Sequence, residues 1–225
     1  MGAIMNKYPL MAALGLGFGL AGCAGGVPFG ARAVSPPETG IRAAYLYTSY
    51  DRAGSNGQGP VSIALLCDMP ASLLKGISYQ DESTVADIDL LSTFSVSGGV
   101  SGLKLSVVSA ELQGSLSDYY ELKLTRVVKR YVSQEQANAV FSQLVSRRGC
   151  AAAYMSERSA RAVYQIRAVY LGDVHFGVKR DAGFSADLAI KLKALEPKIK
   201  AQLKRAYNLS FDGKQMVGAV ETIPR

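Results

Sequence analysis

Apolar and polar residues alternate with a period of two through the middle of the chain. The alternation runs through residues 85–90, 103–107 and 120–125, and turns rich in glycine and serine separate these three segments. A period of two places the apolar side chains of each segment on one face of a strand. The pattern therefore predicts an antiparallel meander with one buried face.

Three further segments have strand character. Residues 41–50 are rich in β-branched and aromatic side chains. Residues 61–67 form a short apolar run, which is typical of a strand buried on both faces. Residues 163–178 return to strand character, and Gly172 marks an expected turn or bulge within them.

Two segments have the 3.6-residue period of a helix. Ser133 is a suitable N-cap for the first, Gln136 completes a weak capping box, and the sequence at 147–149 is a stop signal. Ser185 caps the second, in which Pro197 is expected to kink or divide the helix. The apolar stripes are Ala137, Val140, Phe141 and Leu144 in the first helix, and Leu188, Leu192, Leu195, Ile199 and Leu203 in the second.

The order of these elements predicts the fold class. Asp212-Gly213, close to the last residue, is the sequence of a type I′ turn and predicts a hairpin. Strands and helices do not alternate strictly, which argues against a parallel sheet. We therefore expect an α+β fold with a largely antiparallel β-sheet, two main helices packed on it and a C-terminal β-hairpin, in a single domain over residues 41–225.

The first 23 residues have the three parts of an export signal. Lys7 supplies positive charge, and no acidic residue precedes Glu38. The apolar stretch Leu10–Leu20 is too short to cross a hydrocarbon core, which needs roughly 20 apolar residues. The tetrapeptide LAGC at residues 20–23 then resembles the lipobox of bacterial lipoproteins, in which small residues precede a cysteine. Residues 1–22 are therefore predicted to be a lipoprotein signal peptide.

The resemblance implies a specific modification and location. In bacterial lipoproteins a diacylglycerol is attached to the cysteine sulfur, the signal is cleaved before that cysteine, and the new amino group receives an acyl chain such as palmitate. The lipid would thus be on Cys23, and buried acyl chains would hold the protein on a membrane. The residue directly after the cysteine is Ala24, not the aspartate that would indicate a membrane other than the outer membrane. The resemblance therefore implies an outer-membrane lipoprotein facing the periplasm. A plain secretory signal cut near Ala24, or a buried N-terminal helix, is the alternative.

Residues 23–40 are expected to comprise the lipidated cysteine and a flexible tether. The segment from Ala24 to Gly40 has four glycines, three prolines and no apolar periodicity. A flexible segment of this length spans about 20–25 Å as a random coil, and Pro36-Pro37 stiffens it. The alternative is an extended arm packed on the domain.

The three cysteines fit this assignment. If Cys23 is lipidated, Cys67 and Cys150 remain and can form a disulfide in an oxidising compartment. Two unconnected buried cysteines are the alternative, since each has small apolar neighbours. No second cysteine lies at C-x-x-C spacing, so the sequence supports neither a redox motif nor a zinc site, and no metal or cofactor is expected.

Positive charge is concentrated in the second predicted helix. The whole chain has a formal net charge of +7, and loss of Lys7 with the signal would leave +6. Six basic residues of the helix are candidates for contact with anionic lipid, lipopolysaccharide or an acidic protein partner: Lys191, Lys193, Lys198, Lys200, Lys204 and Arg205. A solvated outer face is the alternative. Nucleic acid is not an expected partner because of the predicted compartment.

The sequence contains little that indicates catalysis. His175 is the one histidine and is expected to face solvent, and Asp87 and Asp89 would share one face of a strand. There is no G-x-S-x-G elbow and no Walker lysine. Twelve tyrosines fit either a core or a binding surface. We expect a membrane-anchored, non-catalytic binding or accessory component of an envelope assembly, transport or secretion system. An envelope hydrolase, or a lipoprotein that binds glycan or lipid, is the alternative.

Overall fold

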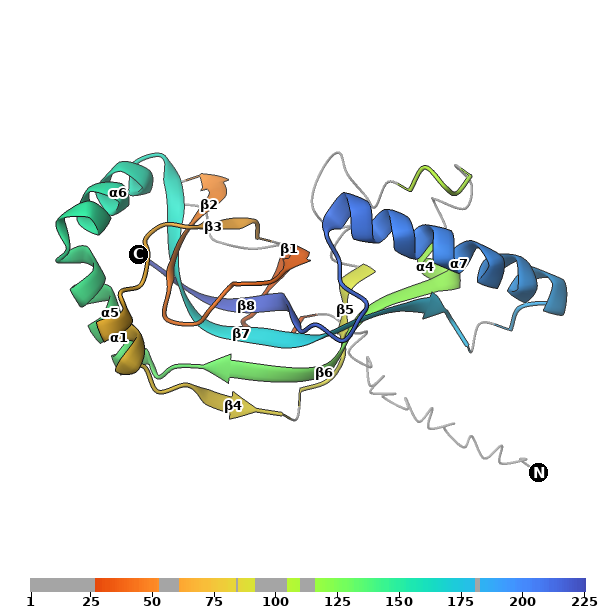
Figure 1. The fold of residues 1–225 in the computed structure, drawn as a ribbon, viewed down its shortest axis with the longest axis horizontal. Coiled ribbons are helices and arrows are strands. Elements are labelled where there is room, and N and C mark those ends of the chain that lie inside the picture. The colour runs from red at the N-terminus through yellow and green to blue at the C-terminus, as the bar shows by residue number, and fades with distance from the viewer. Residues whose placement is uncertain (1–26, 53–60, 84, 92–104, 110–115, 181–182) are drawn as a thin grey trace, which may run out of the picture.

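A computed structural model describes most of the domain and shows one continuous antiparallel sheet with helices at its two ends (Figure 1). The described residues are 27–52, 61–83, 85–91, 105–109, 116–180 and 183–225. The predicted α+β class is confirmed. Among these residues, no helix is both long enough and apolar enough to span a membrane.

The long strand β7 (Arg161–Val178) organises the sheet. Along one edge it pairs with β8 (Met216–Pro224). Along its other edge it pairs first with β2 (Leu46–Arg52) and then with β6 (Tyr120–Tyr131). One strand of 18 residues therefore holds together both ends of the molecule.

Four shorter strands extend this centre. β1 (Arg32–Glu38) lies beside β8, and β3 (Ile63–Leu65) lies beside β2. β4 (Gln80–Glu82) and β5 (Ile88–Asp89) pair with β6. All of these strand pairs are antiparallel, as predicted.

At one end the sheet curls until its outer strands meet. Val61 donates its backbone N–H to the carbonyl of Ala33 at 2.7 Å and accepts a hydrogen bond from the N–H of Ser35 at 3.3 Å. Helices at this end are α1 (Ala71–Lys75), α5 (Gln134–Val145) and α6 (Arg148–Arg158) (Figure 1).

A disulfide links the loop after β3 to α6 in this part of the molecule. It joins Cys67 to Cys150, whose Cα atoms are 5.5 Å apart. Both cysteines belong to a buried cluster that also contains Leu46, Leu144 and Ile166. We call the part of the molecule built on this cluster the disulfide end.

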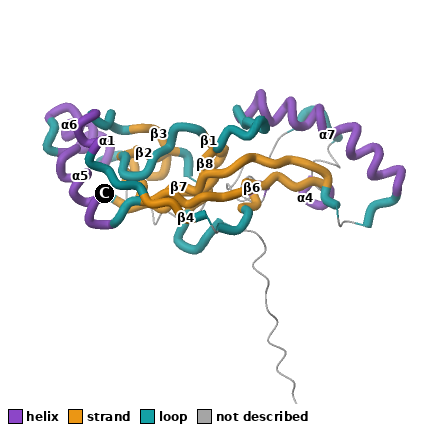
Figure 2. The backbone as a smooth tube through the Cα atoms, turned by 60° about the horizontal axis from the view of Figure 1, so that its bottom comes forward, coloured by secondary structure: helices purple, strands orange, loops and turns teal. Residues whose placement is uncertain are grey.

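The opposite end is built on a second apolar cluster beneath the helix α7 (Ala186–Tyr207). Figure 2 shows α7 lying over one face of the ribbon that β6 and β7 form. Leu192, Ile199 and Leu203 of α7 are buried against this ribbon. The short helix α4 (Leu116–Tyr119) completes what we call the α7 end.

The irregularity predicted at Gly172 lies in the neighbouring strand. β6 has a bulge there, with Arg126 at a φ of 53°, while β7 continues through Gly172 and pairs with Met216. A Cβ atom on Gly172 would lie 2.6 Å from the carbonyl oxygen of Thr125. Glycine is therefore required because the bulged backbone approaches it closely.

Both predicted helix caps are present. Ser133 accepts a hydrogen bond from the N–H of Gln136, and Ser185 accepts one from the N–H of Leu188. Pro197 does not divide α7, because its ring lies on the exposed side of the helix, where water can satisfy the carbonyl it leaves unpaired.

The structure corrects the prediction of two main helices. The sequence at 147–149 does not stop the helical region: α6 begins at Arg148, directly after α5 ends. The cause is the disulfide and the buried Tyr154, which hold this additional helix against the end of the sheet.

The flexible tether predicted for residues 23–40 is corrected over its second half. Arg32–Glu38 forms β1, because β8 would otherwise have an unpaired edge next to its buried residues Val217, Ala219 and Val220. Edge strands tolerate the prolines in this segment. The structure thus agrees with the alternative of an extended arm. Cys23 lies outside the described residues.

Three other strand predictions are wrong in detail. The C-terminal hairpin is replaced by the single strand β8, since Leu209 before Asp212-Gly213 packs into the α7 end and does not pair. Residues 105–109 form a turn with Leu105 buried, while 92–104 lie outside the described residues. The 61–67 run is not buried on both faces: Leu65 is 47 % exposed, because β3 is at an edge of the sheet.

Candidate functional site

The outer face of α7 carries the basic residues singled out in the sequence. Because Leu192, Ile199 and Leu203 point down into the core, a helical spacing of 100° per residue places another set of residues on the opposite ridge. This ridge is apolar and exposed, and consists of Ile190, Ala194, Pro197 and Ala201. Ile190 is 67 % exposed, which is unusual for an isoleucine in a domain of this size.

Basic residues flank this ridge on both sides. The helical spacing places three on one side and three on the other: Lys193, Lys200 and Lys204, and then Lys191, Lys198 and Arg205. Within the described part of the chain, Lys200 pairs with Glu196 at 2.8 Å and Lys204 lies 3.6 Å from Asp212. We call the ridge and its two basic rows the α7 face.

Polar contacts fix the orientation of α7 on the sheet. The hydroxyl of Tyr120 donates to the carbonyl of Leu192 at 2.8 Å, and burial raises the pKa of Tyr120 to about 12. Gln202 accepts a hydrogen bond from the N–H of Val107 and donates one to Ser106. These contacts hold the α7 face outward.

The candidate catalytic residues lie together on the other face of the ribbon. Asp89 pairs with Lys123 across β5 and β6, and Lys123 pairs with His175 across β6 and β7. His175 is exposed, as expected, and its ring lies 3.5 Å from Glu121. A hydrogen bond to Glu121, with smaller contributions from the charges of Asp87 and Asp89, raises the pKa of Lys123. These charged groups form an open surface.

A buried carboxylate lies at the junction of the two ends. Glu221 on β8 is 7 % exposed and accepts hydrogen bonds from the hydroxyl of Tyr170 and the ammonium group of Lys129, both at 2.7 Å. Arg167 contacts its other oxygen. Burial alone would raise the pKa of Glu221, but the hydrogen bonds from these three partners outweigh it and the pKa is lowered. No local pattern in the sequence indicates this cluster, because its members are distant in the chain.

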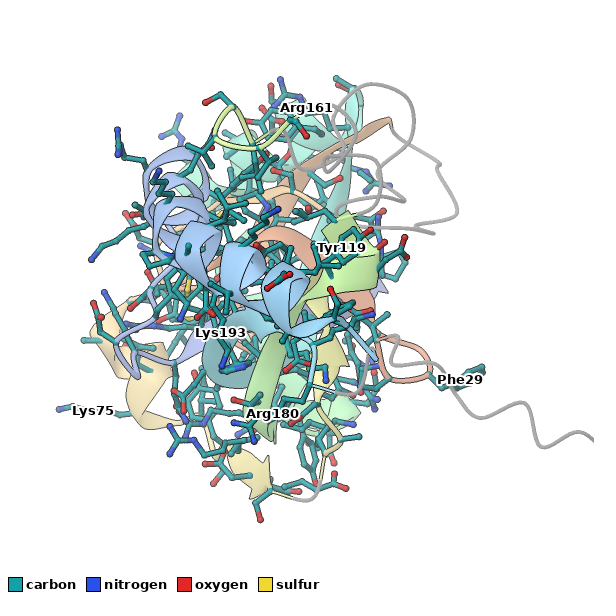
Figure 3. All side chains as sticks on the ribbon, turned by 90° about the vertical axis from the view of Figure 1, so that its right-hand side faces the viewer. Phe29, Lys75, Tyr119, Arg161, Arg180 and Lys193 are labelled. Carbon is teal, nitrogen blue, oxygen red and sulfur yellow. A yellow bond between two sulfur atoms is a disulfide. The ribbon has the colours of Figure 1, made fainter. Side chains whose placement is uncertain are left out.

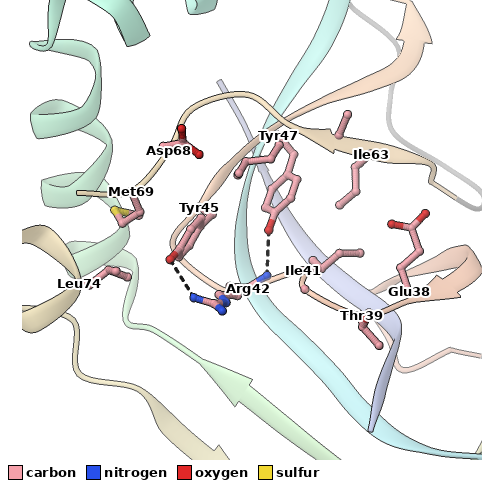
Figure 4. A pocket seen from close by; sticks show the side chains of 13 residues that line it. Glu38, Thr39, Ile41, Arg42, Tyr45, Tyr47, Ile63, Asp68, Met69 and Leu74 are labelled. Atoms are coloured by element: carbon pink, nitrogen blue, oxygen red, sulfur yellow. Dashed lines mark hydrogen bonds between the residues drawn. The ribbon is translucent and has the colours of Figure 1, made fainter. Parts of the chain in front are cut away.

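The structure also contains a groove that the sequence did not predict. It has a volume of about 680 Å³ and lies at the disulfide end, between the residues that end β1 and the strand β3. Figure 4 shows Tyr45 and Tyr47 along it, together with Arg42. The N–H of Arg42 donates to the Tyr47 hydroxyl at 2.9 Å, and its guanidinium donates to the Tyr45 hydroxyl at 3.3 Å. Burial raises the pKa of Tyr47 to about 12.

Two carboxylates lie at the sides of this groove, Glu38 and Asp68 (Figure 4). Burial raises the pKa of Glu38 above its usual range. The sequence contains one signal for the groove, the Pro36-Pro37 pair, which by itself indicates a stiff part of a tether. Many of the tyrosines, in contrast, are core residues: Tyr120, Tyr164 and Tyr170 are almost fully buried.

Comparison with known proteins gives little guidance. No protein-family model matches the chain, and no curated protein matches it. Among solved structures, a bacterial gasdermin from Bradyrhizobium tropiciagri resembles it over 85% of this chain and 80% of that one, with 13% sequence identity and a TM-score of 0.37. A likeness this slight supports no conclusion about fold or function.

Proposed function

We propose that the protein is a bacterial envelope lipoprotein, anchored by a lipid on Cys23, that works by binding through the α7 face. It serves as a non-catalytic accessory component of an assembly, transport or secretion system, on the outer membrane and facing the periplasm. The observation that carries the proposal is the α7 face itself. A helix whose apolar underside packs on the sheet presents a second apolar ridge, formed by Ile190, Ala194, Pro197 and Ala201, between two basic rows.

The body of the protein would lie close to its anchor. Val27 packs against the core of the α7 end, and three residues separate it from Cys23 in the sequence. Four residue steps span about 14 Å when fully extended. This is shorter than the tether expected from the sequence.

The α7 face points away from the start of the described chain. Phe29 is fully exposed on a turn in which the N–H of Ala31 donates to the carbonyl of Pro28 at 2.9 Å. Figure 3 shows Phe29 projecting well away from α7. An anchor near Phe29 therefore leaves the α7 face free for a second component, which we propose to be an acidic protein of the envelope.

The first test is the intact mass of the protein isolated from membranes, for wild type and Cys23→Ala. We expect wild type to begin at Cys23 with added acyl mass and to fractionate with membranes. The Cys23→Ala variant should lack both properties. An unmodified chain that still contains residues 1–22 would exclude the lipoprotein assignment.

The second test addresses the α7 face. Lipoprotein extracted in mild detergent is separated by native electrophoresis, for wild type and for Lys191→Glu, Lys193→Glu and Lys198→Glu combined. We expect wild type to migrate in a larger assembly, and the triple variant to be released from it because the charge complementarity is reversed.

A matched control changes the same charge elsewhere: Lys75→Glu, Arg148→Glu and Arg180→Glu combined, all exposed. The control should retain the assembly. If both triple variants behave alike, the effect is one of net charge, and the α7 face is not the binding surface.

A further inference from the structure

We infer that the groove beside β3 binds an extended peptide segment of a partner, which adds to β3 as a further strand and places a lysine or arginine side chain next to Glu38. This site is separate from the lipid anchor and from the α7 face, and the inference depends on neither.

The free edge of β3 is the first observation. Leu66 donates its N–H to the carbonyl of Leu46, and Tyr50 donates its N–H to the carbonyl of Ser62, so the even-numbered residues of this segment bond to β2. Bonding in an antiparallel pair alternates along the strand, so the peptide groups of Ile63 and Leu65 point the other way. Within the described part of the chain, no strand pairs with them on that side.

Val61, two residues before Ile63, shows that this edge can accept a strand. Val61 has the same orientation as Ile63 and Leu65, and its N–H and carbonyl are both bonded to β1, at Ala33 and Ser35. The pairing with β1 is thus begun at Val61 but is not continued along β3.

Two prolines explain why the pairing stops. Pro36 and Pro37 follow Ser35 directly and have no N–H to donate. The register of β1 against β8 also shifts between Ala33 and Glu38, which moves β1 away from β3 while it remains paired with β8. The groove of about 680 Å³ occupies the space that opens between β1 and β3.

The lining of the groove favours a peptide with apolar and basic side chains. Leu65, Met69 and Leu74 provide apolar surface, and Tyr45 and Tyr47 provide aromatic rings with polar tips. Glu38 is half-buried, and its burial disfavours the ionised carboxylate. A cationic side chain beside it would compensate for that cost.

The alternation of donors and acceptors favours a peptide over a small molecule. The peptide groups of Ile63 and Leu65 repeat every two residues, about 6.7 Å along a strand, which is the repeat of another extended backbone. Strand addition to a free sheet edge takes its affinity from such main-chain bonds and its specificity from side-chain pockets.

The test uses the full-length protein in detergent and labelled heptapeptides of alternating valine and threonine, with either lysine or glutamate at the centre. Fluorescence anisotropy gives the dissociation constants. We expect the lysine peptide to bind at least about tenfold more tightly than the glutamate peptide. Methylation of the peptide's backbone nitrogens that face β3 should likewise weaken binding of the lysine peptide by about tenfold.

Variants of the protein locate the site. Glu38→Gln should reduce the preference for lysine to about twofold or less, whereas Glu135→Gln, an exposed glutamate at the start of α5, should leave it unchanged. Leu65→Pro should abolish binding by removing one N–H from the edge of β3. The methylated peptide tests the reciprocal bonds, from the peptide N–H groups to the carbonyls of β3, without any change to the protein.

Three results would overturn the inference. One is no binding of either peptide, and another is equal binding of the lysine, glutamate and methylated peptides. The third is binding of lysine amide alone as tightly as the peptide, which would identify a site for a small cation.

Discussion

The two ends of the molecule are built in different ways on the same long strand. At the disulfide end the sheet curls until β1 meets the segment before β3, and a disulfide ties the loop after β3 to α6. At the α7 end a single long helix lies over the ribbon of β6 and β7, and its apolar stripe packs into that core.

This difference shows how one fold can provide two kinds of binding surface. The disulfide end adds hydrogen bonds between its outer strands and a covalent link to its apolar cluster, which can maintain a preformed groove beside an unpaired strand edge. The α7 end is closed by apolar packing, which leaves the outer side of the helix free to carry charge. We expect the two ends to respond differently to perturbation, because stability is seldom uniform across a structure.

The largest effect should come from the disulfide. Cys67→Ser combined with Cys150→Ser removes a link between residues 83 apart in the sequence. The chain-entropy model predicts a loss of about 4–5 kcal/mol in the free energy of unfolding. Urea unfolding measures the loss, and hydrogen exchange locates it.

We expect faster exchange in β2, β3 and α6, with α7 less affected. Reduction of the wild type with dithiothreitol should reproduce the result. An unchanged midpoint in the double variant, or faster exchange confined to α7, would contradict the distinction between the two ends.

A smaller effect is expected from a cavity beneath α7. Ile199 is fully buried there, and Ile199→Ala should lower the free energy of unfolding by about 2–5 kcal/mol, with exchange increasing first in α7. Ile190→Ala is the control on the same helix, since Ile190 is 67 % exposed and should change stability by less than about 0.5 kcal/mol. Similar losses for the two variants would mean that α7 is not packed as described.

Glu221 tests the connection between the ends. Glu221→Gln removes the charge that Lys129, Tyr170 and Arg167 surround, and should cost about 1–3 kcal/mol at neutral pH. The folded protein lowers the pKa of Glu221 below 4.5, so its ionised form stabilises the fold above about pH 4.5. This contribution is lost as the pH falls through the folded pKa.

The measurement is the urea midpoint of wild type and Glu221→Gln between pH 3 and pH 8. The difference should be constant above about pH 5 and shrink toward acid pH. The exposed Glu135→Gln should show no such dependence. A difference that grows as the pH falls would reverse the sign and exclude an ionised Glu221.

The smallest effect is expected at the edge of the α7 face. Lys204 and Asp212 are 65% and 78% exposed, with 3.6 Å between the ammonium nitrogen and the carboxylate. Lys204→Ala should therefore change the free energy of unfolding by no more than about 0.5 kcal/mol. A loss above about 1 kcal/mol would show that the α7 face contributes to the fold as well as to binding.

Features that depend only on neighbouring residues can be predicted from the amino-acid sequence alone. Serine caps at Ser133 and Ser185 were predictable because a cap needs only the first turn of its helix. The buried and exposed sides of α7 followed from the helical period, and the strand character of β6 from a period of two. The basic residues of the α7 face were found for the same reason. The lipobox resemblance is equally local and stays a prediction.

Which strand edges are paired and which stay free depends on contacts between distant parts of the chain. The sequence around Arg32–Glu38 predicts a tether, because the segment contains prolines and lies between glycines. In the structure these residues pair with β8 and form β1. The groove exists because Pro36 and Pro37 interrupt the pairing of that same strand with β3. The Glu221 cluster likewise joins three strands. Hydrogen bonds between strands connect residues far apart in the chain, so no local pattern of residues records them.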